Sequence, residues 1–236
     1  MTTPAGSEAR PQRTRDWWIA VLFIVGSALF AMGAVPSYAT AVGLRAAALT
    51  FFAGSLFFTS AAFLQYREAV DVVSAADGAG RDGVRRRLAV WAPNDGGWLS
   101  GAVQLAGTLW FNWSTANAVR DNLDAATADQ RVWRPDALGS IAFLVASGIA
   151  WRQASRDADP VHPRPRAWWI GAINMLGSIA FGVSAVAAYV VPATGDVRNA
   201  ELANLGTFVG AICFLVGAVL LLPRADSSPP PSTGHP

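Results

Sequence analysis

The sequence has no lysine, one cysteine and only two histidines among its 236 residues. A lone thiol, Cys213, cannot close an internal disulfide, so a disulfide-stabilised scaffold is excluded. His162 and His235 have no partners at a spacing typical of metal ligands. We therefore expect no metal site and no cofactor.

Charge is also scarce. Charged residues make up 14% of the chain and hydrophobic residues 53%, whereas a soluble domain carries about 25% charged residues. The charges lie in blocks between six apolar runs, and Asp136 at the edge of the fourth run is the exception. This pattern is typical of an integral membrane protein. The net charge is only +2, and no basic face with interleaved aromatic residues appears, so nucleic-acid binding is not expected.

Catalytic constellations are missing as well. The sequence contains no Ser-His-Asp set, no metal-binding motif and no glycine loop of the kind that holds phosphate. Pumps and proton-coupled transporters depend on charged groups within the membrane. The near absence of charge from the apolar runs argues against these classes, and we expect a non-enzymatic protein without catalytic residues.

What the sequence does contain is six long apolar runs, and a membrane-spanning helix needs about 20 such residues. The third run reaches a comfortable length only with its polar extension to residue 118, and the fourth is at the short end of the range. We predict an all-α fold, a six-helix transmembrane bundle built from three helical hairpins. The runs cover residues 17–35, 46–64, 98–113, 135–151, 168–191 and 202–222.

The same runs divide the chain into alternating membrane and aqueous segments. We expect hairpins over residues 17–65, 98–152 and 168–222, a basic cytoplasmic loop over 66–97 and a second loop over 153–167. The leader (1–16) and the Pro-rich tail (223–236) are predicted to be disordered.

Arginine sets the expected orientation. With the N-terminus inside, thirteen arginines fall in the inner segments and five in the outer loops. The positive-inside rule then places both termini in the cytoplasm and the protein in the plasma membrane.

A short motif recurs in every apolar run, a glycine followed by serine or threonine. The paired glycines are separated by 28, 32 and 29 residues, which indicates one hairpin used three times. In five runs a phenylalanine stands four residues after the glycine, and in the sixth Gly210 stands there instead. The six glycines are Gly26, Gly54, Gly107, Gly139, Gly177 and Gly206; the phenylalanines are Phe30, Phe58, Phe111, Phe143 and Phe181.

Small residues have a physical role in lipid, because they let two helix backbones approach closely. A phenylalanine four residues after the glycine lies on the same helix face and can fill the notch beside a neighbour's glycine. The six motifs form either a packing layer or a shared central site, and we favour packing. Three hairpins of the same orientation can be related by a pseudo-threefold axis along the membrane normal, open as a pore or filled by side chains.

This hairpin pattern resembles the YrhK-like family of small membrane proteins. The stretches that carry the resemblance are Gly54 to Phe58, Gln104 to Asn112 and Trp133 to Leu144. It covers the six helices but neither the tails nor the long inner loop, and the third run departs from it with threonine in place of serine. The resemblance implies a small multi-pass membrane protein and implies no functional residues.

Polar residues gather on one face of the third run, and Asn174 in the fifth run repeats the position of Gln104, three residues before the glycine. These side chains either line a path for a solute or hydrogen-bond between helices, and we favour hydrogen bonding. The candidate lining is Gln104, Thr108, Asn112, Thr115 and Asn174.

The expected partners follow from this reading. The lipid bilayer is the first, and a second copy of the chain is another candidate. Arg85, Arg86 and Arg87 either contact anionic lipid or serve only as an orientation signal. We expect a helix-packing or interaction module, with a conduit for a small neutral solute or ion along the third helix as the alternative.

Overall fold

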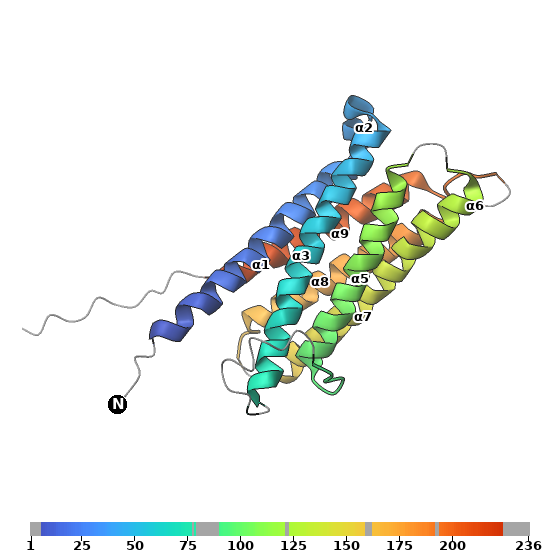
Figure 1. Ribbon diagram of the computed structural model, residues 1–236. Helices are drawn as coiled ribbons and strands as arrows, with labels where there is room; N and C mark the ends of the chain where they lie inside the picture. Colours follow the sequence, from blue (N-terminus) through green and yellow to red (C-terminus); the bar gives the residue numbers. More distant parts are fainter. Residues whose placement is uncertain are drawn as a thin grey trace, which may run out of the picture.

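The computed structural model describes residues 6–76, 78, 90–120, 123–158, 162–191 and 194–223, with side chains from Arg13 onward (Figure 1). The described part is all-helical, as expected, apart from one isolated bridge between Val190 and Val197. Its helices are α1 (Gly6–Gly33), α2 (Pro36–Val42), α3 (Leu44–Ala76), α5 (Gly96–Ala118), α6 (Ala125–Ala128), the π-helix η1 (Asp129–Trp133), α7 (Arg134–Arg156), α8 (Arg166–Ala187) and α9 (Ala200–Leu221).

The long helices lie side by side, and each packs against two others (Figure 1). The contacts run from α1 to α3, α5, α7, α8, α9 and back to α1, so the described long helices form a closed ring. Successive long helices run antiparallel (Figure 1). We call the end that carries α2, α6 and η1 the α6 end, and the end that carries Trp98, Trp151 and Trp168 the Trp98 end.

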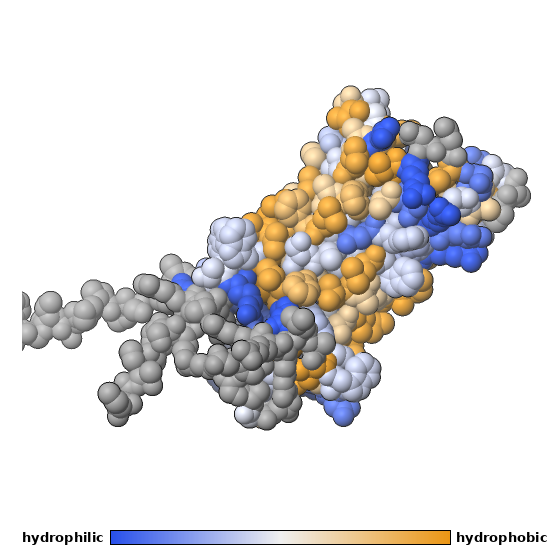
Figure 2. Space-filling model, viewed as in Figure 1, coloured by the Kyte–Doolittle hydropathy of each residue, from blue (hydrophilic) through white to orange (hydrophobic). Residues whose placement is uncertain are grey.

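Four of the described helices are long and apolar enough to cross a membrane. They comprise residues Arg13–Gly33, Leu44–Ala76, Arg166–Ala187 and Ala200–Leu221. In Figure 2 the middle of the visible face is mostly apolar, and strongly hydrophilic residues gather near the α6 end. The membrane class predicted from composition is therefore supported by four apolar helices.

Helices α5 and α7 are not among these four. Helix α5 carries Gln104, Asn112 and Asn117, and α7 has charged residues at both ends, Arg134 and Arg156 among them. Both helices are nevertheless 23 residues long, which corresponds to about 34 Å at about 1.5 Å per residue.

Two segments that the sequence analysis treated as irregular are helical. The leader predicted to be disordered over residues 1–16 belongs to α1 from Gly6 onward. The loop predicted over 66–97 begins with residues 66–76, which continue α3 to Ala76. Both segments contain mainly residues that tolerate a helix, and each extends a helix already nucleated by an apolar run, so propagation is favourable.

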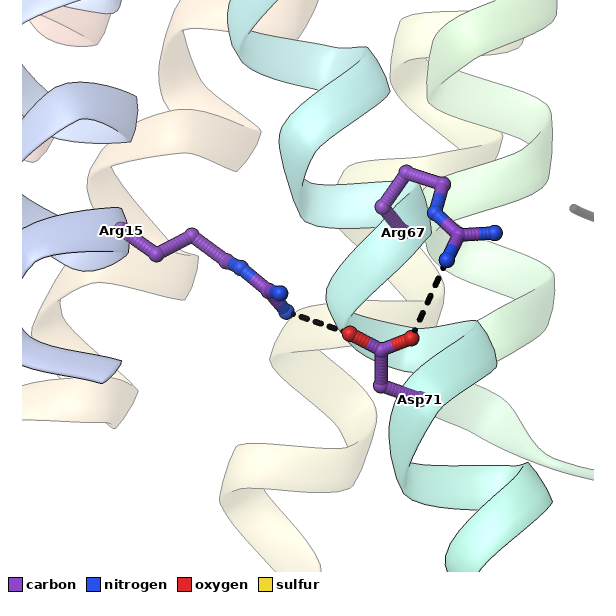
Figure 3. Close-up of polar contacts among 3 residues, drawn as sticks. All are labelled: Arg15, Arg67 and Asp71. Carbon is purple, nitrogen blue, oxygen red and sulfur yellow. Dashed lines mark hydrogen bonds and ion pairs between the residues drawn. The ribbon is translucent and has the colours of Figure 1, made fainter. Parts of the chain in front are cut away.

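A charged contact joins these two extensions at the Trp98 end. Asp71 of α3 accepts hydrogen bonds from Arg15 of α1 at 2.7 Å and from Arg67, one helical turn before it, at 3.2 Å (Figure 3). All three side chains are partly exposed: Arg15 by 38%, Arg67 by 15% and Asp71 by 22%. The contact holds the start of α1 against the end of α3 outside their most apolar parts.

The short elements at the α6 end were not anticipated. Pro36 occupies the first turn of α2, where a missing N–H costs nothing, and Gly43 ends that helix with φ +88°. The Arg85, Arg86 and Arg87 cluster and the tail beyond Pro223 lie outside the described residues.

Candidate functional site

Glycines make the closest approaches between helices of a hairpin. A Cβ atom added to Gly26 of α1 would lie 3.0 Å from the carbonyl oxygen of Gly54 in α3, and one added to Gly54 would lie 3.2 Å from that of Gly26. Gly107 and Gly139 face each other in the same way, with corresponding distances of 3.3 and 3.1 Å. At these crossings a side chain would push the backbones apart, which is why glycine is required.

The third crossing has a different register from the one that the motif suggested. In α9 the residue opposite Gly177 is Gly210. A Cβ atom added to Gly210 would lie 3.0 Å from the carbonyl oxygen of Gly177. Gly206 packs one turn away, where its added Cβ would lie 2.8 Å from the Ala180 oxygen of α8. The phenylalanine that follows Gly210 by four residues is Phe214, so the sixth helix does carry the Gly-x-x-x-Phe spacing.

Each long helix contributes one phenylalanine to the centre of the ring. We call these residues the phenylalanine cluster, and each is between 3% and 7% exposed. The rings of α1, α5 and α8 form one triangle, with centroids 6.0 to 6.4 Å apart, and those of α3, α7 and α9 form a second, at 5.5 to 6.3 Å. The cluster comprises Phe30, Phe58, Phe111, Phe143, Phe181 and Phe214.

The two triangles fill the interior at this level. Rings of the same hairpin meet across the triangles at 5.3 to 5.7 Å, mostly edge to face, an arrangement that aromatic quadrupoles favour. The void left among five of the rings and Ser55 has a volume of about 10 Å³, which is close to the least that one water molecule needs, roughly 10–15 Å³. A continuous aqueous path does not pass between these residues.

Three of the α5 residues predicted to line a solute path instead form hydrogen bonds to backbone carbonyls of α5 or to side chains of α3. Thr108 donates to the Leu105 carbonyl at 2.8 Å, and Asn112 donates to the Thr59 hydroxyl of α3 at 2.8 Å. Thr115 donates to the Phe111 carbonyl at 2.7 Å, and its hydroxyl lies 3.0 Å from that of Ser55. These contacts place them in helix packing rather than beside a cavity.

The other two predicted residues come together. Gln104 of α5 and Asn174 of α8 line a cavity of about 50 Å³ that also touches Phe214 of the phenylalanine cluster. Gln65, from the Trp98 half of α3, completes a set of three amides from three helices. The same amides line a larger cavity of about 530 Å³ toward the Trp98 end. We call these two spaces, which share the three amides, the amide cavity.

Asn174 lies at the closed end of the amide cavity and is not fully satisfied. Its Oδ1 is buried and finds no donor among the described residues. Gly217 of α9 leaves the room for this amide, because a Cβ at that position would collide with Asn174 Oδ1. A buried acceptor without a partner costs about 1–3 kcal/mol, so this oxygen favours a bound hydrogen-bond donor.

The wide part of the amide cavity is more polar and includes two carboxylates. Glu68 and Asp157 line it together with Gln153. The serines on its wall are already engaged, since Ser100 donates to the Ala146 carbonyl at 3.0 Å and the Ser147 hydroxyl lies 2.8 Å from that of Ser178. This composition suits a small molecule that is neutral or cationic and rich in hydrogen-bond donors.

Side chains of the metal-binding type, carboxylates among them, also lie outside the amide cavity. No three His, Cys, Asp or Glu side chains cluster as a metal site in the described part of the chain. At the α6 end, hydrogen bonds from the backbone and side chain of Thr127 lower the pKa of the Asp124 carboxyl group. That contact caps α6.

Sequence reasoning missed Gln65. Gln65 stands immediately after the second apolar run, and a polar amide at that place in a sequence indicates only that the membrane segment has ended. A usable signal was present for the other two amides, because Gln104 and Asn174 both stand three residues before a crossing glycine. Phe23 has the same offset from Gly26 and lines the same cavity.

No known family model matches the chain, and neither the curated proteins nor the solved structures contain a match to it.

Proposed function

We propose that the chain is an integral protein of the plasma membrane with six membrane-spanning helices, four apolar ones together with α5 and α7. Their length of about 34 Å exceeds the hydrocarbon thickness of about 30 Å, and each lies in the ring between two other long helices. Asn112 and Thr115 of α5 are turned into contacts with α3, and Gln104 is turned into the amide cavity. The arginine distribution supports a cytoplasmic Trp98 end and two cytoplasmic termini.

The three hairpins are proposed to be repeats around a pseudo-threefold axis, within a YrhK-like family. Three glycine crossings with the same reciprocal geometry and two phenylalanine triangles support the repeat. Residues at corresponding offsets also have corresponding places, as Phe23, Gln104 and Asn174 show. The resemblance to that family rests on the motif alone.

In function, the protein is a non-enzymatic helix-packing and interaction module. The observation that carries this proposal is the phenylalanine cluster, which closes the axis where a channel would need to be open. The bilayer is its environment, with a second copy of the chain and anionic lipid at Arg85, Arg86 and Arg87 as proposed contacts.

A flux assay with a parallel size measurement tests the module. The purified chain is reconstituted in liposomes, and entry of urea, glycerol and potassium is followed beside protein-free liposomes. We expect equal rates with and without protein, together with a single defined mass in detergent by light scattering. Protein-dependent flux of any of the three solutes would contradict a module with a closed axis.

The amide cavity favours a second function, a carrier for a small neutral solute that enters from the cytoplasmic side. A carrier does not need a continuous pore, because the closed layer and the open cavity exchange sides during transport. Asn174 Oδ1 supplies the unsatisfied acceptor such a solute would meet.

For the carrier, Gln104→Leu is the diagnostic change, because it removes an amide from the cavity wall without touching a charged group. If the protein is a carrier, protein-dependent glycerol or urea uptake should fall about 5- to 150-fold, since one lost hydrogen bond to a desolvated polar partner costs about 1–3 kcal/mol. Gln130→Leu, at an exposed position of η1, is the matched control and should keep the wild-type rate. Equal uptake by both variants would exclude a carrier that uses this cavity.

A further inference from the structure

A second hollow lies away from the axis, between α7 and α8 in their α6-end halves. Its volume is about 750 Å³, within the range of about 300–1,000 Å³ typical of ligand sites. Most of its wall is aliphatic, and Arg198, Asn199 and Trp133 stand at its α6 end. We call this hollow the α7/α8 groove.

At the level of the groove, α7 and α8 lack a hydrogen bond that joins α3 to α5. Ser55 of α3 stands one residue after the crossing glycine of its helix, and Thr115 of α5 stands eight residues after the crossing glycine of its own helix. Their hydroxyl groups form a hydrogen bond that joins α3 to α5. The corresponding residues between α7 and α8 are Ser140 and Ala185. Ala185 offers no hydroxyl, and the Ser140 hydroxyl, on a side chain that is 2% exposed, has no partner among the described residues.

The same two helices are joined nearer the Trp98 end. There the hydroxyls of Ser147 and Ser178 lie 2.8 Å apart, and Ser178 also donates to the Phe143 carbonyl at 3.2 Å. Gly182, which has no side chain to fill the space, lies beyond this contact and lines the groove. The helices are thus fastened in one half and leave a hollow in the other.

The rim of the groove is apolar and outward-facing. Ile141, Ile179, Val183 and Val186 line it and are 44% to 60% exposed. In water, exposure of these apolar side chains would cost about 25 cal/mol for each Å² of apolar surface. In the proposed membrane arrangement these side chains face lipid chains, and the groove opens sideways into the outer leaflet.

A positive charge stands where the polar part of a lipid would lie. Arg198 is exposed and forms no ion pair with any described residue, and its backbone N–H is held by the Tyr189 carbonyl at 2.8 Å. Trp133 donates to the Ala185 carbonyl at 2.8 Å, and its ring lies 4.9 Å from that of Tyr189. Tryptophan and tyrosine are enriched at the depth of lipid headgroups.

We propose that the α7/α8 groove binds a phospholipid of the outer leaflet, with an acyl chain along the apolar wall and an anionic phosphodiester headgroup at Arg198. This inference rests on the proposed membrane-spanning arrangement. The aliphatic wall selects a hydrocarbon chain. The Arg198 guanidinium selects a headgroup with a net negative charge over a zwitterionic one, because the cation of a zwitterionic headgroup offsets the attraction between its phosphate and the guanidinium.

Native mass spectrometry of the full chain, released from vesicles of equal parts phosphatidylglycerol and phosphatidylcholine, tests the proposal. We expect one retained phosphatidylglycerol per chain. Arg198→Gln should weaken its retention about tenfold relative to phosphatidylcholine, because the net negative headgroup loses its cationic partner, whereas phosphatidylcholine carries a cation of its own. Arg131→Gln, also exposed and at the α6 end, is the matched control and should retain the wild-type preference.

A second variant, Ala137→Leu, fills the groove from α7 and should lower retention of both lipids, with unchanged circular dichroism as the check on folding. Equal loss in Arg198→Gln and Arg131→Gln would overturn the proposal in favour of general surface charge. Unaltered retention in both Arg198→Gln and Ala137→Leu would overturn it too. Carbonate extraction separates this failure from that of the membrane arrangement, because an inserted chain without a lipid site remains in the membrane fraction.

Discussion

At the scale of single residues, glycine and phenylalanine act as complementary shapes. The Phe58 ring lies over Gly26, and the Phe30 ring lies over Gly54, with added Cβ atoms at 2.7 and 2.8 Å from the nearest ring carbons. Each ring thereby occupies space that the partner glycine leaves empty. Hydrophobicity does not drive helices together in lipid, so this close packing supplies much of the association energy.

Gly26→Ala tests the crossing directly. The new methyl group would meet both Phe58 and the Gly54 carbonyl, and an overpacked core costs about 1–3 kcal/mol. We expect the free energy of unfolding to fall by that amount when purified protein is titrated with sodium dodecyl sulfate and followed by circular dichroism.

Gly148→Ala is the control for this measurement. Gly148 lies within α7, and a Cβ there has nothing within 4 Å. Alanine is favoured over glycine in a helix by up to about 1 kcal/mol, so this variant should be neutral or slightly more stable. Equal destabilisation by the two substitutions would mean that the crossing is not specifically packed.

The residue scale also shows why the sequence motif was incomplete. A search for glycine followed by a hydroxyl residue selects Gly206-Thr207 in α9, but the crossing uses Gly210, followed by Ala211. What the crossing requires is the absence of a side chain at one position and a ring four residues later. Two of the motif hydroxyls, Ser55 and Ser178, contact a neighbouring hairpin, whereas that of Thr207 lies 2.8 Å from the Ser184 hydroxyl of its own hairpin.

At the scale of helices, neighbouring hairpins are joined by a few polar contacts at different heights. Ser55 and Thr115 join α3 to α5, and Ser147 and Ser178 join α7 to α8. The polar stripe of the third apolar run was visible in the sequence. Which members bond to α3 and which face the amide cavity depended on the rotation of α5 against its neighbours, which periodicity does not specify.

Cysteine pairs test this order of helices. In a Cys213→Ala background, Ser147→Cys with Ser178→Cys should form an internal disulfide on mild oxidation, because the wild-type hydroxyl oxygens are 2.8 Å apart and a disulfide needs a Cα separation of about 4.4–6.8 Å. The product is read as joined fragments after proteolysis between α7 and α8.

The control pair is Ser55→Cys in α3 with Ser147→Cys in α7. These two helices are not neighbours in the ring. This pair should stay reduced within one chain. Efficient bridging of the control pair, or none in the Ser147 and Ser178 pair, would contradict the order of helices described above.

At the scale of the whole molecule, the two ends differ in composition and shape. The amide cavity opens toward the Trp98 end, whereas the α7/α8 groove lies toward the α6 end. The phenylalanine cluster fills the interior of the ring at its own level. The proposed orientation places these ends on opposite sides of the membrane.

Accessibility of single cysteines tests the orientation. In the Cys213→Ala background, Thr194→Cys at the α6 end should react with a membrane-impermeant maleimide on intact cells. Asn94→Cys at the Trp98 end should react only after permeabilisation, because the positive-inside rule places that end in the cytoplasm. Both residues are exposed. Labelling of both on intact cells would rule out an odd number of crossings between residues 94 and 194.

Composition and periodicity were sufficient for the all-helical class, because long apolar runs with few charges have few alternatives to helices that bury them in lipid. They also indicated the glycine and phenylalanine positions of five helices and two of the three amides of the cavity. The sixth register, the place of Gln65, the closure of the axis and the α7/α8 groove emerged only from the packed structure. Each of these depends on how helices distant in sequence rotate and approach one another, which is set by contacts between side chains rather than by the pattern along any one helix.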